Sequence, residues 1–203
     1  SINLGKFRIE FIKTNHSIQD ASALAIYSPA GIVVHTGDFK VDYTPVFGDA
    51  IDLQRFAEIG KKGVLALMSD STNAVRAGFT QSEKTVGKTF DRLFAEHHHR
   101  RIIVATFASN VDRVQQIINT SYKYGRKVVV EGRSMVNIIS VASELGYLQV
   151  PENTLIDVDQ LKNYAPENTT IITTGSQGES MAALSRMSAG VHRKISIQPT
   201  DTI

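Results

Sequence analysis

Two short polar segments near the start of the chain carry residue types that metal sites in proteins use. Residues 14–20 read Thr-Asn-His-Ser-Ile-Gln-Asp and residues 35–40 read His-Thr-Gly-Asp-Phe-Lys, and each follows an apolar run. The imidazole of His16 and the carboxylate of Asp38 both suit zinc, and a carboxylate can bridge two ions. Two ligands are too few for a zinc site. The alternative is that both side chains only form hydrogen bonds with the backbone of their own turns.

A third polar segment, Ser69-Asp70-Ser71-Thr72-Asn73, follows the continuous apolar run at residues 64–68. That run predicts a strand buried on both faces. A carboxylate at the carboxyl end of a buried strand lies where α/β proteins bind ligands, so Asp70 is a candidate catalytic residue beside Asp38. The alternative is that Asp70 caps the loop or helix that follows.

Two further loops combine small, hydroxyl and amide residues in a way that suits phosphate binding. Residues 106–110 read Thr-Phe-Ala-Ser-Asn and residues 173–179 read Thr-Thr-Gly-Ser-Gln-Gly-Glu, and both precede an expected helix. Free N–H groups at helix starts, with glycines that allow close approach, bind phosphate. The candidate contacts are Ser109, Asn110, Gly175, Ser176, Gln177, Gly178 and Glu179. Neither loop is a P-loop, because no Gly-Lys-Ser/Thr occurs, and ordinary helix capping is the alternative.

The first part of the chain is expected to be antiparallel sheet. Residues 6–12 alternate and place three apolar side chains on one face, which predicts a half-buried strand. Residues 23–28 and 31–36 are β-rich runs broken by Pro-Ala-Gly, which predicts a hairpin. Asp52 is expected to cap a short helix that follows.

From about residue 62 the pattern changes to strands that alternate with helices. A capping box at residues 80–83 and a capping residue at Asn110 mark two helix starts. The expected strands are residues 64–68, 102–107, 128–130, 170–174 and 195–197, and further helices are expected at residues 135–145 and 180–189. Short loops between these elements predict a doubly wound, mainly parallel α/β sheet with helices on both faces.

Composition narrows the class of protein. Of the 203 residues, 42% are hydrophobic and 21% are charged, which excludes a disordered or collagen-like chain. There is no cysteine, so a disulfide scaffold, a thiolate metal site and a cysteine nucleophile are excluded. The net charge of +2 is too small to require a polyanion as partner. No membrane helix or signal peptide is evident, so we expect a cytoplasmic protein without membrane contact.

The five polar segments together resemble the ribonuclease J family, which belongs to the β-CASP branch of the metallo-β-lactamase superfamily. The matching segments, in the family's order, are residues 14–20, 35–40, 69–73, 107–110 and 175–179. The resemblance spans nearly the whole chain. It implies a partial metallo-β-lactamase domain at residues 1–72, followed by a partial β-CASP domain of doubly wound α/β type at residues 73–203.

The resemblance also implies a role for each matching segment. His16 is similar to a histidine ligand of one zinc ion, Asp38 to the carboxylate that bridges two zinc ions, and Asp70 to an acidic residue that supports the site. The loops at 107–110 and 175–179 would lie along an RNA channel. The implied reaction is hydrolysis of single-stranded RNA by 5′–3′ exonucleolytic or endonucleolytic cleavage, as in rRNA processing, with two zinc ions that activate water.

Other parts of the family's pattern are absent from the chain. These are the His-x-His-x-Asp-His motif, a later Gly-His-x-Ser loop and a terminal ligand histidine. We therefore expect an internal piece of a longer protein, with an incomplete zinc site and no activity by itself. The resemblance implies that the intact protein is a homo-oligomer or pairs with a related subunit.

Two other functions fit the same residues. One is a metal-free α/β module that binds a nucleotide or a sugar phosphate at Ser109 and Ser176, because its loops are complete in this chain. The other is a catalytically weak partner subunit of an active nuclease. The parent reading frame discriminates among them, because only a nuclease requires the absent histidine motifs on either side.

Overall fold

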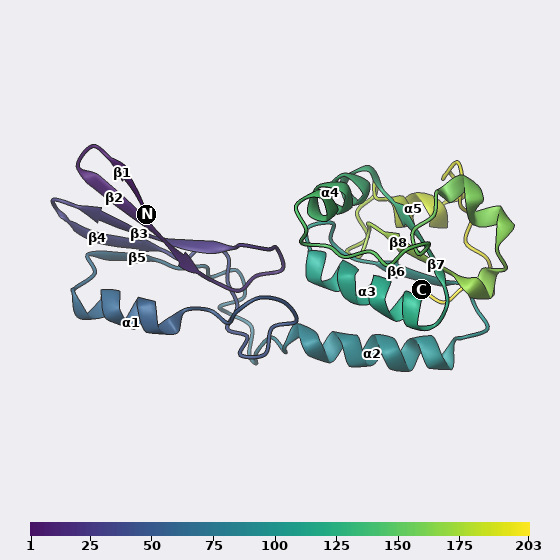
Figure 1. Cartoon of the computed structure of the whole chain (residues 1–203), viewed down its shortest axis with the longest axis horizontal. Coiled ribbons are helices and arrows are strands. Elements are labelled where there is room, and N and C mark those ends of the chain that lie inside the picture. The colour runs from purple at the N-terminus through teal and green to yellow at the C-terminus, as the bar shows by residue number, and fades with distance from the viewer. The chain divides into compact units, whose positions relative to one another are not determined.

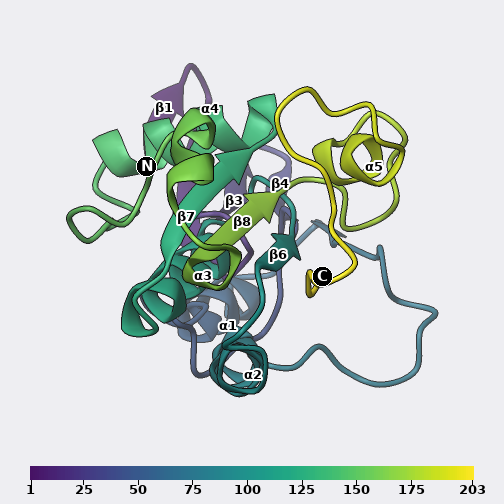
Figure 2. The same ribbon diagram turned by 90° about the vertical axis from the view of Figure 1, so that its right-hand side faces the viewer.

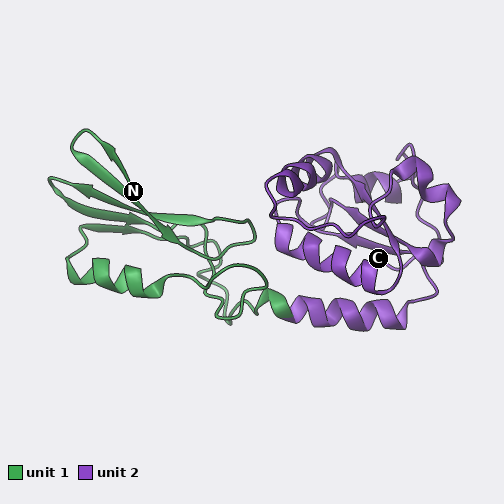
Figure 3. Ribbon diagram, viewed as in Figure 1, with its two compact units in different colours: residues 1–84 green, residues 85–203 purple.

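The computed structural model describes all 203 residues, which form two compact units (Figure 3). Unit 1 is Ser1–Lys84 and unit 2 is Thr85–Ile203. The division between the two compact units falls within helix α2 (Glu83–Glu96). The boundary expected between residues 72 and 73 is of another kind, because it divides the two domains that the family resemblance implies. The assignment of family domains at 72 and 73 stays a prediction.

Unit 1 is a five-stranded sheet with strands in sequence order (Figure 1). Its elements are β1 (Ile2–Leu4), β2 (Phe7–Lys13), β3 (Ser22–Ser28), β4 (Gly31–His35), α1 (Leu53–Lys61) and β5 (Ala66–Met68). The first four strands are antiparallel, which confirms the expected hairpin, and β5 pairs with β4 in parallel. The carboxyl ends of β4 and β5 therefore meet at one edge of the sheet.

Helix α1 covers one face of this sheet. Asp52 caps it as expected, because its carboxylate accepts a hydrogen bond from the Arg55 N–H at 2.9 Å. The buried cluster beneath the helix consists of Ile12, Ala23, Ala25, Val34 and Ile59. Phe7 and Phe11 lie on the alternate face of β2 and are 48% and 53% exposed. The strand is confirmed, but α1 does not cover the apolar face that the sequence pattern singled out.

Strand β5 is exposed, so the expectation of a strand buried on both faces at residues 64–68 is wrong. The strand is shorter than the apolar run, and Leu65, Leu67 and Met68 are 65%, 64% and 55% exposed. No residue of β5 belongs to the buried cluster of unit 1, and the strand lies at the edge of the sheet, where it pairs only with β4. A continuous apolar run does not reveal on which sides a strand is covered.

Unit 2 is a three-stranded parallel sheet in the order β6-β8-β7 (Figure 2). After α2 its elements are β6 (Ile102–Ala105), α3 (Val111–Lys123), β7 (Lys127–Glu131), α4 (Arg133–Glu144), the 3₁₀ helices η1 (Val158–Asn163) and η2 (Pro166–Asn168), β8 (Thr169–Thr173) and α5 (Ala183–Ser188). This arrangement confirms a mainly parallel α/β fold. No helix in the structure has the length and apolar character that crossing a bilayer requires.

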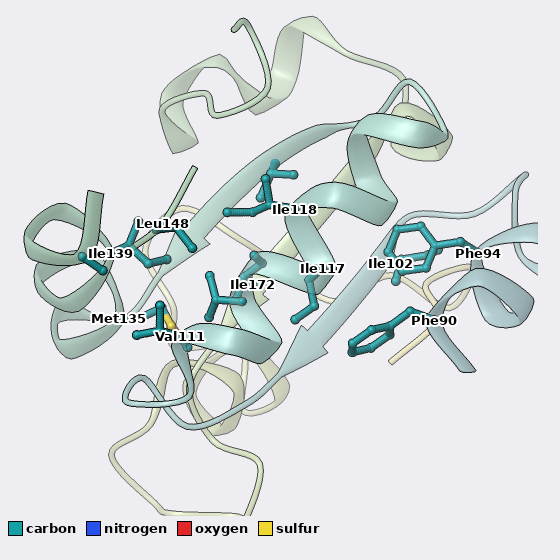
Figure 4. Packing of buried hydrophobic residues seen from close by; sticks show 13 residues of the cluster. Phe90, Phe94, Ile102, Val111, Ile117, Ile118, Met135, Ile139, Leu148 and Ile172 are labelled. Carbon is teal, nitrogen blue, oxygen red and sulfur yellow. The ribbon is translucent and has the colours of Figure 1, made fainter. Parts of the chain in front are cut away.

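Alternate residues of the parallel strands serve two buried clusters on opposite faces of the sheet. Ile102, Val128 and Ile172 pack against α2, α3 and α4 in the larger cluster, part of which Figure 4 shows. Their neighbours Ile103, Val129 and Ile171 pack with residues of α5 and η1. Both faces are covered, as the sequence predicts for a doubly wound sheet.

Three local expectations for residues 80–197 are corrected. Helix α2 begins at Glu83 and not at the capping box, because the Ser82 hydroxyl accepts the Lys84 N–H at 3.3 Å. Helix α5 is shorter than residues 180–189, because the preceding residues form a turn. Residues 195–197 form no strand. The Ile195 side chain is buried, but the backbone N–H of Ile195 donates to His192 Nδ1 at 3.1 Å instead of to a neighbouring strand.

Candidate functional site

The first two polar segments of unit 1 are joined through Asn15. The Lys40 N–H donates to the Asn15 carbonyl at 2.8 Å. The Asn15 side-chain amide donates to the Asp49 carbonyl at 2.9 Å, and its oxygen accepts the Ile51 N–H at 2.8 Å. Asn15 is buried, and its backbone carbonyl, side-chain amide and side-chain oxygen all bond the segment after β4, so the two loops are held together.

The second and third segments are joined through Thr36. Its N–H donates to the Met68 carbonyl at 3.0 Å, and its hydroxyl accepts the Asp70 N–H at 3.0 Å. Gly37 follows with φ of 61°, in the left-handed region that favours glycine, and turns the chain toward Asp38. The parallel pairing of β4 with β5 therefore continues into the two loops.

These contacts bring the three predicted residues of unit 1 together at one edge of the sheet. His16 Nε2 and Asp38 Oδ2 are 3.9 Å apart, and the Asp38 side chain is 75% exposed. The N–H and hydroxyl of Thr72 donate to the Asp70 carboxylate at 2.9 and 2.7 Å and are the main reason that the pKa of Asp70 is lowered. The Phe39 N–H and the charge of His16 lower this pKa further.

The donor chemistry at this edge fits zinc, because imidazole and carboxylate are both common zinc ligands. Across the described chain, however, no three His, Cys, Asp or Glu side chains lie close enough to hold one ion. His16 and Asp38 can thus supply only part of the ligand set of a zinc site.

Asp42 supports the Asp38 loop, and sequence reasoning missed it. Its side chain is buried, and although burial raises its pKa, hydrogen bonds from the Thr44 N–H, the Ser82 hydroxyl and the Glu83 N–H lower the pKa overall. Lys40 Nζ lies 3.5 Å from the carboxylate. The spacing of Asp42 and Thr44 could have revealed this role, because an Asp two residues before a Thr is typical of an Asx turn.

In unit 2, Ser109 and Asn110 lie in the turn before α3. The Asn110 side chain accepts the Arg113 N–H at 3.1 Å and caps the helix, and Asn110 is buried. The Ser109 carbonyl accepts the Val111 N–H at 3.0 Å. The side chain of Asn110 therefore serves the capping role that was the alternative to phosphate contact.

The Gly175–Glu179 loop borders a pocket of about 610 Å³ at the carboxyl ends of the parallel strands. Gly175 and Glu179 line the pocket. Ser176, Gln177 and Gly178 form the exposed turn between them, in which the Gln177 N–H donates to Glu179 and the Gly178 N–H donates to Gly175. The loop is thus preformed, with its hydroxyl and amide side chains exposed.

The same pocket contains residues that sequence reasoning missed: Gly132, Arg133, Ser134 and Arg186. The first three follow strand β7 directly, as the other candidate loops follow their strands. Gly132 has φ of 105°, and a Cβ there would lie 2.9 Å from the Thr174 hydroxyl. Two guanidinium groups against one carboxylate, Glu179, give the pocket a positive charge that suits phosphate.

Comparisons with known proteins show which family this chain resembles in sequence. Residues 99–203 match the family described as "Ribonuclease J, beta-CASP domain". The chain is 48% identical over 202 residues to Ribonuclease J of Helicobacter pylori, an alignment that covers 100% of this chain and 29% of that protein. It is 48% identical over 203 residues to Ribonuclease J of Synechocystis, and this alignment covers 100% of this chain and 32% of the Synechocystis protein. It is 50% identical over 195 residues to Ribonuclease J 1 of Streptococcus pyogenes, and this alignment covers 96% of this chain and 34% of the Streptococcus protein.

The chain therefore spans about a third of the length of these curated relatives. A crystal structure of a protein of unknown function from Enterococcus faecalis is similar with a TM-score of 0.60 and 19% identity, covering 87% of this chain and 43% of that one. At this identity the likeness shows the fold alone.

Proposed function

Since this chain belongs to the ribonuclease J family, we propose that it is part of a longer protein that hydrolyses phosphodiester bonds in RNA. The observation that carries the proposal is the hydrogen-bonded edge of unit 1, which gathers His16, Asp38 and Asp70. The chain's one-third share of its relatives' length supports its being part of a longer protein.

In this proposal His16 and Asp38 would hold zinc, and Asp38 and Asp70 are the catalytic carboxylates. When bound, zinc supplies a Lewis acid for the phosphate and lowers the pKa of water. Asp70 is held ionised by the Thr72 N–H and hydroxyl, so it is a fixed negative charge beside His16. Remaining ligands come from parts of the longer protein that this chain does not contain.

Unit 2 binds the RNA backbone in this proposal. Arg133 and Arg186 pair with phosphate oxygens in the pocket, and the exposed Ser176 and Gln177 donate further hydrogen bonds. Ser109 contributes from the neighbouring turn. These contacts read backbone charge rather than base identity, so they suit single-stranded RNA of many sequences.

Finer features belong to the same proposal. Cleavage proceeds in the 5′–3′ exonucleolytic mode, the endonucleolytic mode or both, and the reaction takes place in the cytoplasm, as in rRNA processing. The intact protein assembles with itself or with a related subunit, which its mass in solution tests directly.

The test is RNA cleavage by the longer natural protein with Asp38→Asn. This change keeps the side chain's shape but removes its charge, so we expect cleavage to fall strongly while thermal stability is kept. The matched control is Asp91→Asn, on an exposed carboxylate that pairs with Lys123. Full cleavage by the Asp38 variant would overturn the proposal.

A second candidate function rests on the pocket of unit 2, which is complete within that unit. A metal-free module that binds a nucleotide or sugar phosphate needs only this pocket. It predicts ligand binding that is unaffected by a chelator, together with no RNA cleavage by the longer protein. A catalytically weak partner subunit instead predicts cleavage only when a second, related chain is present.

A further inference from the structure

Unit 2 contains a second pocket, of about 530 Å³, at the opposite end of its sheet from the candidate RNA site. Arg101, just before β6, and Thr169, at the start of β8, line it together with residues of η1 and the Arg193-Lys194 segment. Its volume lies within the range of small-molecule sites. It shares no lining residue with the pocket at the carboxyl ends of the strands.

The basic side chains around this second pocket outnumber the acidic ones. Arg101 is paired with Asp201 through two hydrogen bonds, and Lys194 lies 3.1 Å from Asp159. Lys162 and Arg193 also line the pocket, are exposed, and have no acidic side chain within ion-pair distance. The pocket therefore carries a surplus of two positive charges.

One wall of the pocket is apolar and includes an aromatic ring. Val158, Leu161 and Pro166 form aliphatic surface beside Tyr164. Tyr164 is 36% exposed, and Lys127 Nζ lies 5.8 Å from the centroid of its ring. An exposed ring beside cations is a surface on which a nucleobase stacks.

We propose that this pocket binds a nucleoside monophosphate, with the phosphate on Lys162 and Arg193 and the base on Tyr164. A phosphate monoester carries a charge of roughly −1.5 to −2 at pH 7, which matches the surplus of two positive charges. The inference does not depend on the proposed nuclease activity, because it uses no residue of the candidate RNA or metal sites.

The experiment is calorimetric titration of the 203-residue chain with 5′-AMP, adenosine and inorganic phosphate. We expect AMP to bind in preference to both other ligands. The double variant Lys162→Gln/Arg193→Gln should weaken AMP binding by about tenfold or more, since it removes both charge-assisted contacts. Tyr164→Ala should weaken binding of AMP but leave that of inorganic phosphate unchanged.

The matched control is Lys88→Gln/Arg92→Gln, which removes two exposed cations of helix α2 outside both pockets and should leave AMP affinity unchanged. Unchanged thermal unfolding midpoints show that the variants are folded. Three results would overturn the proposal: no binding of AMP, equal binding of adenosine and AMP, or loss of AMP binding in the control variant rather than in the Lys162/Arg193 variant.

Discussion

Three carboxylates of unit 1, those of Asp38, Asp42 and Asp70, differ in how many hydrogen bonds hold them. Asp42 and Asp70 each accept hydrogen bonds from neighbouring N–H groups, which fix their orientation and lower their pKa values. Asp38 is largely exposed, and its ion-pair contact is to His16. We therefore expect Asp38 to be the carboxylate that binds an incoming group, whereas the hydrogen bonds to Asp42 and Asp70 hold these two side chains in place.

Replacement of Asp70 by alanine should loosen the loop after β5. The change removes the acceptor of the Thr72 N–H and hydroxyl, so we expect faster hydrogen exchange at the Thr72 amide. Asp70→Asn keeps an acceptor oxygen and should exchange more slowly than the alanine variant. Exchange at the wild-type rate in Asp70→Ala would show that the carboxylate does not hold this loop.

Glu10 gives unit 1 a stability that depends on pH. Hydrogen bonds from Arg55 are the main reason that the pKa of Glu10 is lowered from 4.5 to about 2, and the Tyr27 hydroxyl also donates to it. Because the pKa is lower in the folded state, the stabilisation is fully present above pH 4.5 and is lost as the pH falls toward 2.

The melting temperature of Glu10→Gln, compared with that of the wild type, tests this. We expect the largest difference above about pH 5 and little difference near the folded pKa. The control Glu152→Gln, at an exposed carboxylate with no ion pair, should show no such trend. A difference that does not change between these pH values would contradict the assignment.

At the scale of elements, helix α3 depends on its cap. Asn110→Ala removes the acceptor of the Arg113 N–H and should lower the free energy of unfolding by about 1 kcal/mol. Asn110→Asp keeps an acceptor and should cost much less. Chemical denaturation of the three proteins measures the difference, and equal stability of all three would show that the cap is dispensable.

The turn from β7 into α4 depends on Gly132. An alanine there meets both a positive φ and the Thr174 hydroxyl at 2.9 Å. Gly146 has φ of 77° and open space around it, so Gly146→Ala shares the backbone strain without the clash. We expect Gly132→Ala to unfold at a lower temperature than Gly146→Ala. A lower unfolding temperature for Gly146→Ala than for Gly132→Ala would contradict the close packing of Gly132 against Thr174.

The sequence predicted those elements of the fold that depend on interactions between residues close together in the chain. Asp52 and Asn110 cap helices as expected, because capping needs only residues three positions apart. The parallel sheet of unit 2 followed from alternating strands and helices. The exposure of β5 did not, because it depends on which strands and helices lie beside it.

The candidate site was predictable only in part for the same reason. The residue types singled out His16, Asp38 and Asp70, but their proximity depends on Asn15 and Thr36, whose contacts join distant parts of the chain. Arg133 and Arg186 were missed because arginine is common on surfaces, and only the fold brings both to one pocket. Whether these residues bind metal or RNA stays a prediction.

At the scale of the whole molecule, the two units carry different parts of the proposed reaction. Unit 1 holds the carboxylates and the histidine, and unit 2 holds the positively charged pocket. We expect the 203-residue chain to show no zinc-dependent RNA cleavage by itself, since its ligand set is incomplete. Such cleavage by the purified chain would contradict this division.

Binding of single-stranded RNA by the longer natural protein should depend on salt. A plot of log affinity against log salt should become shallower by about 0.7 for each phosphate contact that is removed. We therefore expect a shallower slope for Arg133→Gln and for Arg186→Gln. The control Arg92→Gln, at an exposed arginine paired with Glu96, should keep the wild-type slope. Wild-type slopes in all variants would exclude the pocket from RNA binding.

In the proposed reaction, His16 and Asp38 bind the metal that RNA cleavage requires. The most direct measurement is the zinc content of the longer natural protein, taken beside its RNA cleavage rate, for His16→Ala and Asp38→Ala. Loss of a residue that only orients a ligand already costs roughly 10- to 100-fold, so loss of a ligand should cost at least about a hundredfold in cleavage. We expect zinc content and cleavage to fall together in both variants. Wild-type zinc content and cleavage in either variant would contradict it.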